Sequence, residues 1–209
     1  MYKSNTPSVK FLGITLDDKL QWNEQINSIL TKINSATYVI RCLRDQVSLS
    51  TIRLFYFACV QSIVSYSIIF WYRTSIINAS RIFIAQKRVI RTMSNMGYNE
   101  SCRGKFKELN IMTVPSLFIY TAALFAKKNP QLFLNNSDFY TMMRTRGGSG
   151  LSVPVHSTAL FNKGPLMNCI KVFNALPAEI RGLVSLNAFK SQLKMFLINK
   201  EYYSIDDFF

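Results

Sequence analysis

The chain has 209 residues, of which 49% are hydrophobic, and it carries a formal net charge of +14. This composition excludes a disordered chain, because it supplies enough apolar surface for a buried core in one large domain or two small ones. The positive charge favours a polyanionic partner, with nucleic acid as the first candidate and an anionic membrane surface as the second.

The N-terminal stretch predicts a short β segment. Apolar side chains alternate imperfectly over residues 9–16 around Gly13, which indicates a strand. A glycine inside a strand suggests the close approach of another backbone or a ligand, with a plain edge strand and turn as the alternative. Asp17 and Asp18 then precede Trp22, so we interpret the acidic pair as a turn or a helix cap.

Two helices are expected between residues 22 and 71. Apolar residues recur at steps of three and four from Trp22 to Leu43, as in an amphipathic helix. Ser48 or Ser50 can cap a second helix that runs through Trp71. Its segment Leu54–Trp71 is uncharged and is just long enough to span a bilayer. Polar side chains within the segment favour the central helix of a bundle, and a small membrane protein is kept as the alternative.

A third helix, expected over residues 78–95, has a basic face. Ile82, Val89 and other apolar residues gather on one side of the helical wheel. The opposite side carries four cations: Arg81, Lys87, Arg88 and Arg91. No Asp or Glu lies between Asp45 and Glu100 to relieve the repulsion among these cations. We therefore favour contact with phosphate groups over the alternative of a merely solvated basic face.

The C-terminal half continues the helical pattern. Thr113 and Pro115 mark the start of one helix, and Ser185 caps the last. Residues 131–164 are loop-rich and contain the run Arg146–Gly150, so this stretch is the predicted linker. The predicted organisation is a β segment at 1–22, a helical bundle at 23–130, a linker with an extended piece at 131–164 and a helical region at 165–209. The predicted fold class is mainly α, a helical bundle with a short N-terminal β segment and a small C-terminal helical region.

Residues typical of catalytic or metal centres are sparse. The four cysteines are far apart in the sequence and His156 is the only histidine, so neither a zinc site nor a catalytic triad is predicted. The cysteine spacing is typical of reduced thiols, and the polar N-terminus has no apolar signal region. We therefore expect an intracellular protein of the nucleus or cytoplasm, not a secreted one.

Several short blocks of the sequence resemble one protein family. Lys10-Phe11-Leu12-Gly13, followed by Ile14-Thr15-Leu16-Asp17 and Trp22, resembles a block downstream of the catalytic aspartates in reverse transcriptases of non-LTR retrotransposons, the LINE-like or jockey-type elements. Later blocks resemble the same family in the same order: Ala85–Arg91, Ser101–Ile111, Thr113–Leu117, Asn174–Pro177 and Tyr203–Asp207. Glycines 147, 148 and 150 depart from the more basic or Asn-rich sequence expected there.

The resemblance implies the C-terminal part of such an enzyme, with the end of the palm, the thumb and the region that follows. It implies a primer grip formed by Lys10, Phe11, Leu12 and Gly13, and thumb helices that lie along the backbone of RNA and of an RNA/DNA hybrid. The complete protein would copy RNA into DNA with Mg²⁺, using an upstream palm and fingers that this chain lacks. Two residues separate Tyr203 from the Asp206-Asp207 pair, so the pair does not match the family's Tyr-x-Asp-Asp motif and the chain alone should not polymerise.

A second hypothesis is a stand-alone nucleic-acid-binding protein, derived from such an element and retained for its basic surface. The N-terminus starts abruptly before a strand, as a break inside a larger reading frame would. An upstream open frame that encodes Tyr-x-Asp-Asp would favour the polymerase fragment over the stand-alone protein.

Overall fold

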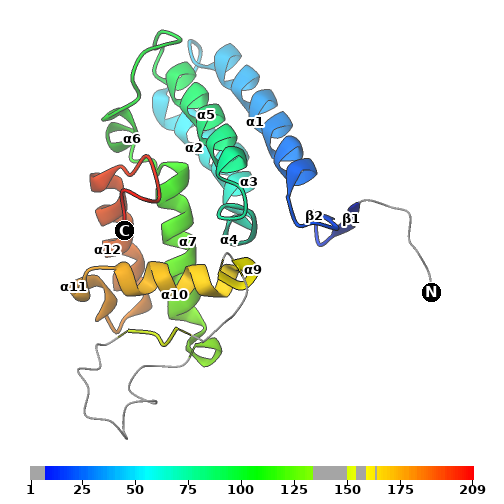
Figure 1. Cartoon of the computed structure of the whole chain (residues 1–209). Coiled ribbons are helices and arrows are strands. Elements are labelled where there is room, and N and C mark those ends of the chain that lie inside the picture. The colour runs from blue at the N-terminus through cyan, green and yellow to red at the C-terminus, as the bar shows by residue number, and fades with distance from the viewer. Residues whose placement is uncertain (1–7, 134–149, 154–158, 163) are drawn as a thin grey trace, which may run out of the picture. The chain divides into compact units, whose positions relative to one another are not determined.

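The computed structural model describes residues 8–133, 150–153, 159–162 and 164–209. The structure is mainly helical, with a two-stranded antiparallel sheet near the N-terminus and helices at the C-terminus, which confirms the predicted fold class (Figure 1). The chain divides into two compact units, residues 1–109 and residues 110–209, which we call the first and the second unit. His156 and glycines 147 and 148 lie outside the described residues.

The first unit begins with a β-hairpin. Strands β1 (Ser8–Phe11) and β2 (Ile14–Asp17) pair antiparallel, with Phe11 opposite Ile14. Leu12 and Gly13 form the turn between them with φ angles of 47° and 78°. Two-residue hairpin turns require such left-handed backbone angles, which glycine adopts without strain. Gly13 therefore lies in a turn, and the prediction of a single strand around it is wrong.

The predicted role of Asp17 at the entry to helix α1 (Asn23–Leu43) is confirmed. Its carboxylate oxygens accept hydrogen bonds from the backbone N–H groups of Gln21 at 2.7 Å and Trp22 at 2.6 Å. These bonds hold the chain where it turns from β2 into the helix. Helix α1 then buries a stripe of isoleucines at the spacing expected for one helical face: Ile26, Ile29, Ile33 and Ile40.

The stretch after α1 is helical but not continuous. Ser48 caps α2 (Leu49–Tyr56) as predicted, by accepting a hydrogen bond from the N–H of Thr51. A π-helical turn η1 (Phe57–Gln61) and α3 (Ser62–Ser65) follow. Tyr66 then takes an extended conformation and Ser67 a left-handed one, with φ 57°, before α4 (Ile68–Trp71).

The prediction of one helix through Trp71 is therefore wrong beyond Ser65. The uninterrupted helix that a membrane span at 54–71 requires is not formed. Among all the residues described, no helix combines the length and the apolar character needed to cross a bilayer.

Helix α5 (Ile76–Met93) completes the helical layer of the first unit and lies beside α1 (Figure 1). The apolar side predicted from the helical wheel is confirmed, since Ile82, Val89 and Ile90 are fully buried. Within this core, Nε2 of Gln86 donates a hydrogen bond of 2.7 Å to the hydroxyl of Tyr56, which joins α5 to α2. A short helix α6 (Lys105–Glu108) ends the unit.

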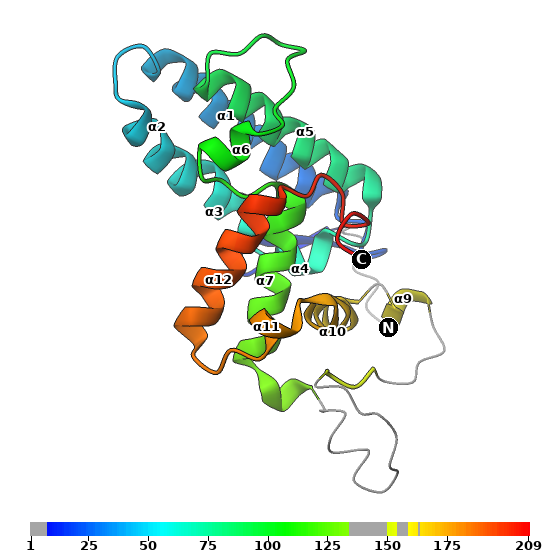
Figure 2. The ribbon, with the colours of Figure 1, turned by 90° about the vertical axis from the view of Figure 1, so that its left-hand side faces the viewer.

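The second unit is built around α7 (Val114–Lys128), which packs against α10 (Pro165–Ala175) and α12 (Leu186–Lys200) (Figure 2). Its short helices are η2 (Pro130–Leu132), α9 (Ala159–Asn162) and α11 (Ala178–Arg181). Thr113 and Ser185 cap α7 and α12 as predicted. The division between the units precedes α7, whereas the predicted helical bundle at 23–130 includes this helix.

Two blocks of the family resemblance have structural roles in the second unit. The side-chain amide of Asn174 forms two hydrogen bonds with the backbone of Leu151: it accepts from the N–H at 2.7 Å and donates to the carbonyl at 2.9 Å. The hydroxyl of Thr113, besides capping α7, donates to the carbonyl of Tyr202 at 2.5 Å. Each contact ties a segment of irregular backbone to a helix that is distant in the sequence.

The C-terminal acidic pair also belongs to a turn. A carboxylate oxygen of Asp207 accepts from the N–H of Ser204 at 2.9 Å, and the N–H of Asp206 donates to the Ser204 hydroxyl at 3.1 Å. The Tyr202 ring lies against Phe196 of α12 and against Phe208, with ring centroids 6.4 Å and 5.5 Å apart. The tail therefore folds back onto the last helix.

Candidate nucleic-acid interface

Helix α5 carries all four cations of the predicted basic face, but it does not present them as one group. Arg81 and Arg88 point toward α1, where both form hydrogen bonds with asparagines. Lys87 contacts a ring of α5 itself, and Arg91 contacts the loop that follows α5. The wheel places all four within one third of the circumference, and the neighbouring elements divide this arc into two edges.

The edge that faces α1 is lined by side-chain amides. The Oδ1 atom of Asn27 accepts a hydrogen bond from Nη2 of Arg81 at 2.8 Å, and that of Asn34 accepts from Nη1 of Arg88 at 3.5 Å. Nearer the start of both helices, Nδ2 of Asn78 donates to Oδ1 of Asn23 at 2.9 Å. We call these six residues the Asn–Arg row: Asn23, Asn27, Asn34, Asn78, Arg81 and Arg88.

The pairing in this row fixes the direction of the two helices. Asn23 meets Asn78, Asn27 meets Arg81, and Asn34 meets Arg88, so that residue numbers rise together along both helices. Helices α1 and α5 therefore run parallel. The two arginines are seven residues apart, which corresponds to about 10 Å along the helix axis.

The charge of these two arginines is not compensated by a neighbouring acid. In the described part of the chain, ion pairs are formed by Arg44 with Asp45 and by Lys105 with Glu108, and neither involves the row. Glu24 is the one acidic residue of α1, and its carboxylate accepts from the hydroxyl of Ser8 at 2.6 Å. Arg81 and Arg88 are both exposed to solvent, so their remaining N–H groups can reach a ligand.

The other two cations take part in the packing of the first unit. The Nζ atom of Lys87 lies 4.8 Å from the centroid of the Phe83 ring, within the range of a cation–π interaction. Nε of Arg91 donates to the carbonyl of Glu100 at 2.8 Å and so holds the loop after α5. Both side chains are partly covered.

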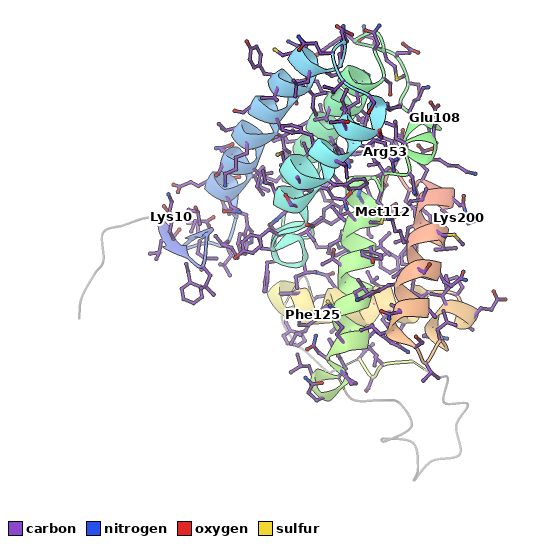
Figure 3. All side chains as sticks on the ribbon, turned by 180° about the vertical axis from the view of Figure 1, so that it is seen from behind. Lys10, Arg53, Glu108, Met112, Phe125 and Lys200 are labelled. Carbon is purple, nitrogen blue, oxygen red and sulfur yellow. The ribbon has the colours of Figure 1, made fainter. Side chains whose placement is uncertain are left out.

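The predicted primer-grip residues lie at the tip of the hairpin. Lys10 and Phe11 end β1, and Leu12 and Gly13 form the turn, with Phe11 61% and Leu12 73% exposed. Figure 3 shows Lys10 on the hairpin beside the start of α1. The N–H of Thr15 in β2 donates to Oε1 of Gln25 at 2.9 Å. The hairpin and Arg81 therefore both contact the first two turns of α1.

Tyr66 attaches the hairpin turn to the helices. Its hydroxyl donates to the carbonyl of Leu12, and its ring lies 3.8 Å from the position that a Cβ atom on Gly13 would take. The break after α3 makes this contact possible, because the extended Tyr66 leaves the helical path. Sequence reasoning missed this role, since the residues around Tyr66 follow a helical apolar pattern without a glycine or proline to mark the break.

Sequence reasoning also missed the asparagines of the row. A signal was present, because Asn27 and Asn34 have the same spacing of seven residues as Arg81 and Arg88. Residues seven apart lie on one helical face. On adjacent parallel helices, each asparagine of such a pair can therefore lie beside one arginine of the other pair.

The acidic residues of the chain give no metal centre in the part that the structure describes, where no three His, Cys, Asp or Glu side chains converge. Asp17 and Asp207 instead accept hydrogen bonds from the backbone. Comparisons of the chain with family models, with curated proteins and with solved structures found no significant match.

Proposed function

We propose that the chain is the C-terminal part of a non-LTR retrotransposon reverse transcriptase and that it binds the backbone of the RNA/DNA template-primer. The observation that carries the proposal is the pair of exposed arginines, Arg81 and Arg88, which form no ion pair with any carboxylate that the structure describes. The order of the sequence blocks that resemble this family supports the assignment to a polymerase.

The geometry suits contact with phosphate groups rather than with bases. A guanidinium has five N–H donors, and each arginine of the row uses only one or two of them within the protein. The separation of about 10 Å exceeds the rise of about 3.4 Å per phosphate along one DNA strand, so the two arginines would contact different phosphates. Backbone contacts carry no sequence information, as suits an enzyme that copies any template.

Within this proposal the chain holds the nucleic acid and does not perform the reaction. The hairpin tip at Lys10 to Gly13 would lie near the 3′ end of the primer, and the helices of the first unit along the duplex. The carboxylates that bind Mg²⁺ and the metal itself would belong to the upstream palm. A stand-alone protein derived from such an element would use the same arginines on the same backbone.

The proposal is tested by the salt dependence of binding to an RNA/DNA hybrid. The double substitution Arg81→Ala and Arg88→Ala should weaken binding and reduce the slope of log K against log salt by about 1.8, since each phosphate contact contributes about 0.9. A matched control, Lys190→Ala with Lys194→Ala on α12, removes the same charge from the second unit and should change the slope less. A slope that the arginine substitutions leave unchanged would exclude this face from the binding site.

A primer-extension assay tests whether the chain binds the hybrid without catalysing polymerisation. The wild-type chain, given Mg²⁺, hybrid and nucleotides, should bind the hybrid without extending the primer. Extension by the purified chain would contradict the assignment of catalysis to residues outside it.

A further inference from the structure

The Asn–Arg row orients two arginines without neutralising them. Arginines in proteins commonly find carboxylate partners, which both fix the planar guanidinium and cancel its charge. Here the acceptors are neutral amide oxygens of α1. We propose that Asn27 and Asn34 are positioning residues, which hold Arg81 and Arg88 in place for phosphate groups while leaving their full charge available. This inference rests on the proposed function.

The row holds its two arginines to different degrees. Arg81 donates both to Asn27 at 2.8 Å and to Asn78 at 3.2 Å. Asn78 is itself 3% exposed and donates to the backbone carbonyl of Gln21 at 3.2 Å. Arg81 is therefore braced by a side chain that is fixed in turn. Arg88 has one contact in the row, the longer one to Asn34, so Asn27 is the more informative position to change.

Asparagine and aspartate are nearly identical in shape, which allows orientation and charge to be separated. Asn27→Asp keeps an oxygen acceptor for Arg81 but adds a negative charge next to the guanidinium. Asn27→Ala removes the acceptor and leaves the charge of Arg81 intact. If Asn27 orients Arg81 and also leaves its positive charge available to phosphate, these two substitutions will differ in the salt dependence of binding.

The experiment compares these variants with the wild-type chain on a short RNA/DNA hybrid over a range of salt concentrations. Asn27→Asp should reduce the salt slope by about 0.9 and weaken binding about eightfold at 0.1 M salt, the contribution expected of one phosphate contact. Asn27→Ala should weaken binding less and leave the slope near that of the wild type. The matched control is Ser28→Asp, which adds the same charge at an exposed position next in the sequence but 100° around the helix.

Equal losses for Asn27→Asp and Ser28→Asp would overturn the inference, because a general change in net charge would then explain both. An Asn27→Asp variant that binds like the wild type would overturn it as well. Failure of the wild-type chain to bind the hybrid would instead refute the proposed function. In that case the effect of Asn27 on Arg81 is measured without nucleic acid, from the NMR signals of the Arg81 side chain. The guanidinium of Arg81 should rotate faster in Asn27→Ala than in the wild type. An unchanged rotation rate would overturn the inference.

Discussion

The buried contact between Tyr56 and Gln86 should decide how firmly α5 is held in the first unit. Tyr56 is 0% exposed and Gln86 is 1% exposed, and they join α2 to the helix that carries Arg81 and Arg88. Tyr56→Phe removes the hydroxyl that accepts from Gln86, so the buried hydrogen bond between α2 and α5 is lost. The free energy of unfolding at neutral pH should fall by about 0.5–1.5 kcal/mol, the usual net contribution of one hydrogen bond.

The same substitution should change the response of the protein to alkali. Burial raises the pKa of Tyr56 above its ordinary value of about 10, more than the hydrogen bond from Gln86 lowers it. The unfolded chain releases this proton as the pH rises above 10, whereas the folded chain retains it. By pH 11 the wild type has therefore lost about 1.4 kcal/mol of stability through Tyr56, relative to neutral pH, and Tyr56→Phe has not.

The assay is chemical denaturation followed by tryptophan fluorescence at several pH values. Both tryptophans, Trp22 and Trp71, are buried in the first unit, so their emission reports on that unit. The difference in stability between wild type and Tyr56→Phe should be constant from pH 7 to pH 9 and should shrink by about 1.4 kcal/mol by pH 11. Tyr38→Phe, at a position 66% exposed on α1, is the control for loss of a hydroxyl. A difference that stays constant up to pH 11 would refute the reasoning.

Two further substitutions test contacts that hold irregular segments. Tyr66→Phe removes the hydroxyl that donates to the carbonyl of Leu12, so amide hydrogen exchange in the hairpin should become faster. The denaturation midpoint of the first unit should barely change. Unaltered exchange would show that the turn does not depend on this hydrogen bond. Asn174→Ala removes both hydrogen bonds to Leu151 and should destabilise the second unit by about 1–3 kcal/mol, as measured by denaturation followed by circular dichroism. The stability of Asn174→Asp should be intermediate, because aspartate keeps only the acceptor. If Asn174→Ala were as stable as the wild type, these two hydrogen bonds would not stabilise the second unit.

The sequence alone determined the features that depend on neighbouring residues. The apolar stripe of α5 and the caps at Ser48, Thr113 and Ser185 follow from helical periodicity and from hydroxyl groups placed before the first turn. The role of Asp17 could be predicted for the same reason, because its partners lie four and five residues away. The basic character of α5 was likewise visible, since it requires only the identity and spacing of its residues.

Contacts between distant residues were decided by the tertiary structure. The hairpin turn at Gly13 depends on strand pairing, and the break at Tyr66 serves a contact with residues more than fifty positions earlier. A helical wheel places Arg81, Lys87, Arg88 and Arg91 on one arc, but it contains no information about the neighbouring elements. Only the packing of α1 against α5 turned Arg81 and Arg88 toward asparagines, and only the fold of the following loop placed the carbonyl of Glu100 beside Arg91, because these partners lie on other elements. The contact of Lys87 with Phe83 lies within α5 and depends on a spacing of four residues.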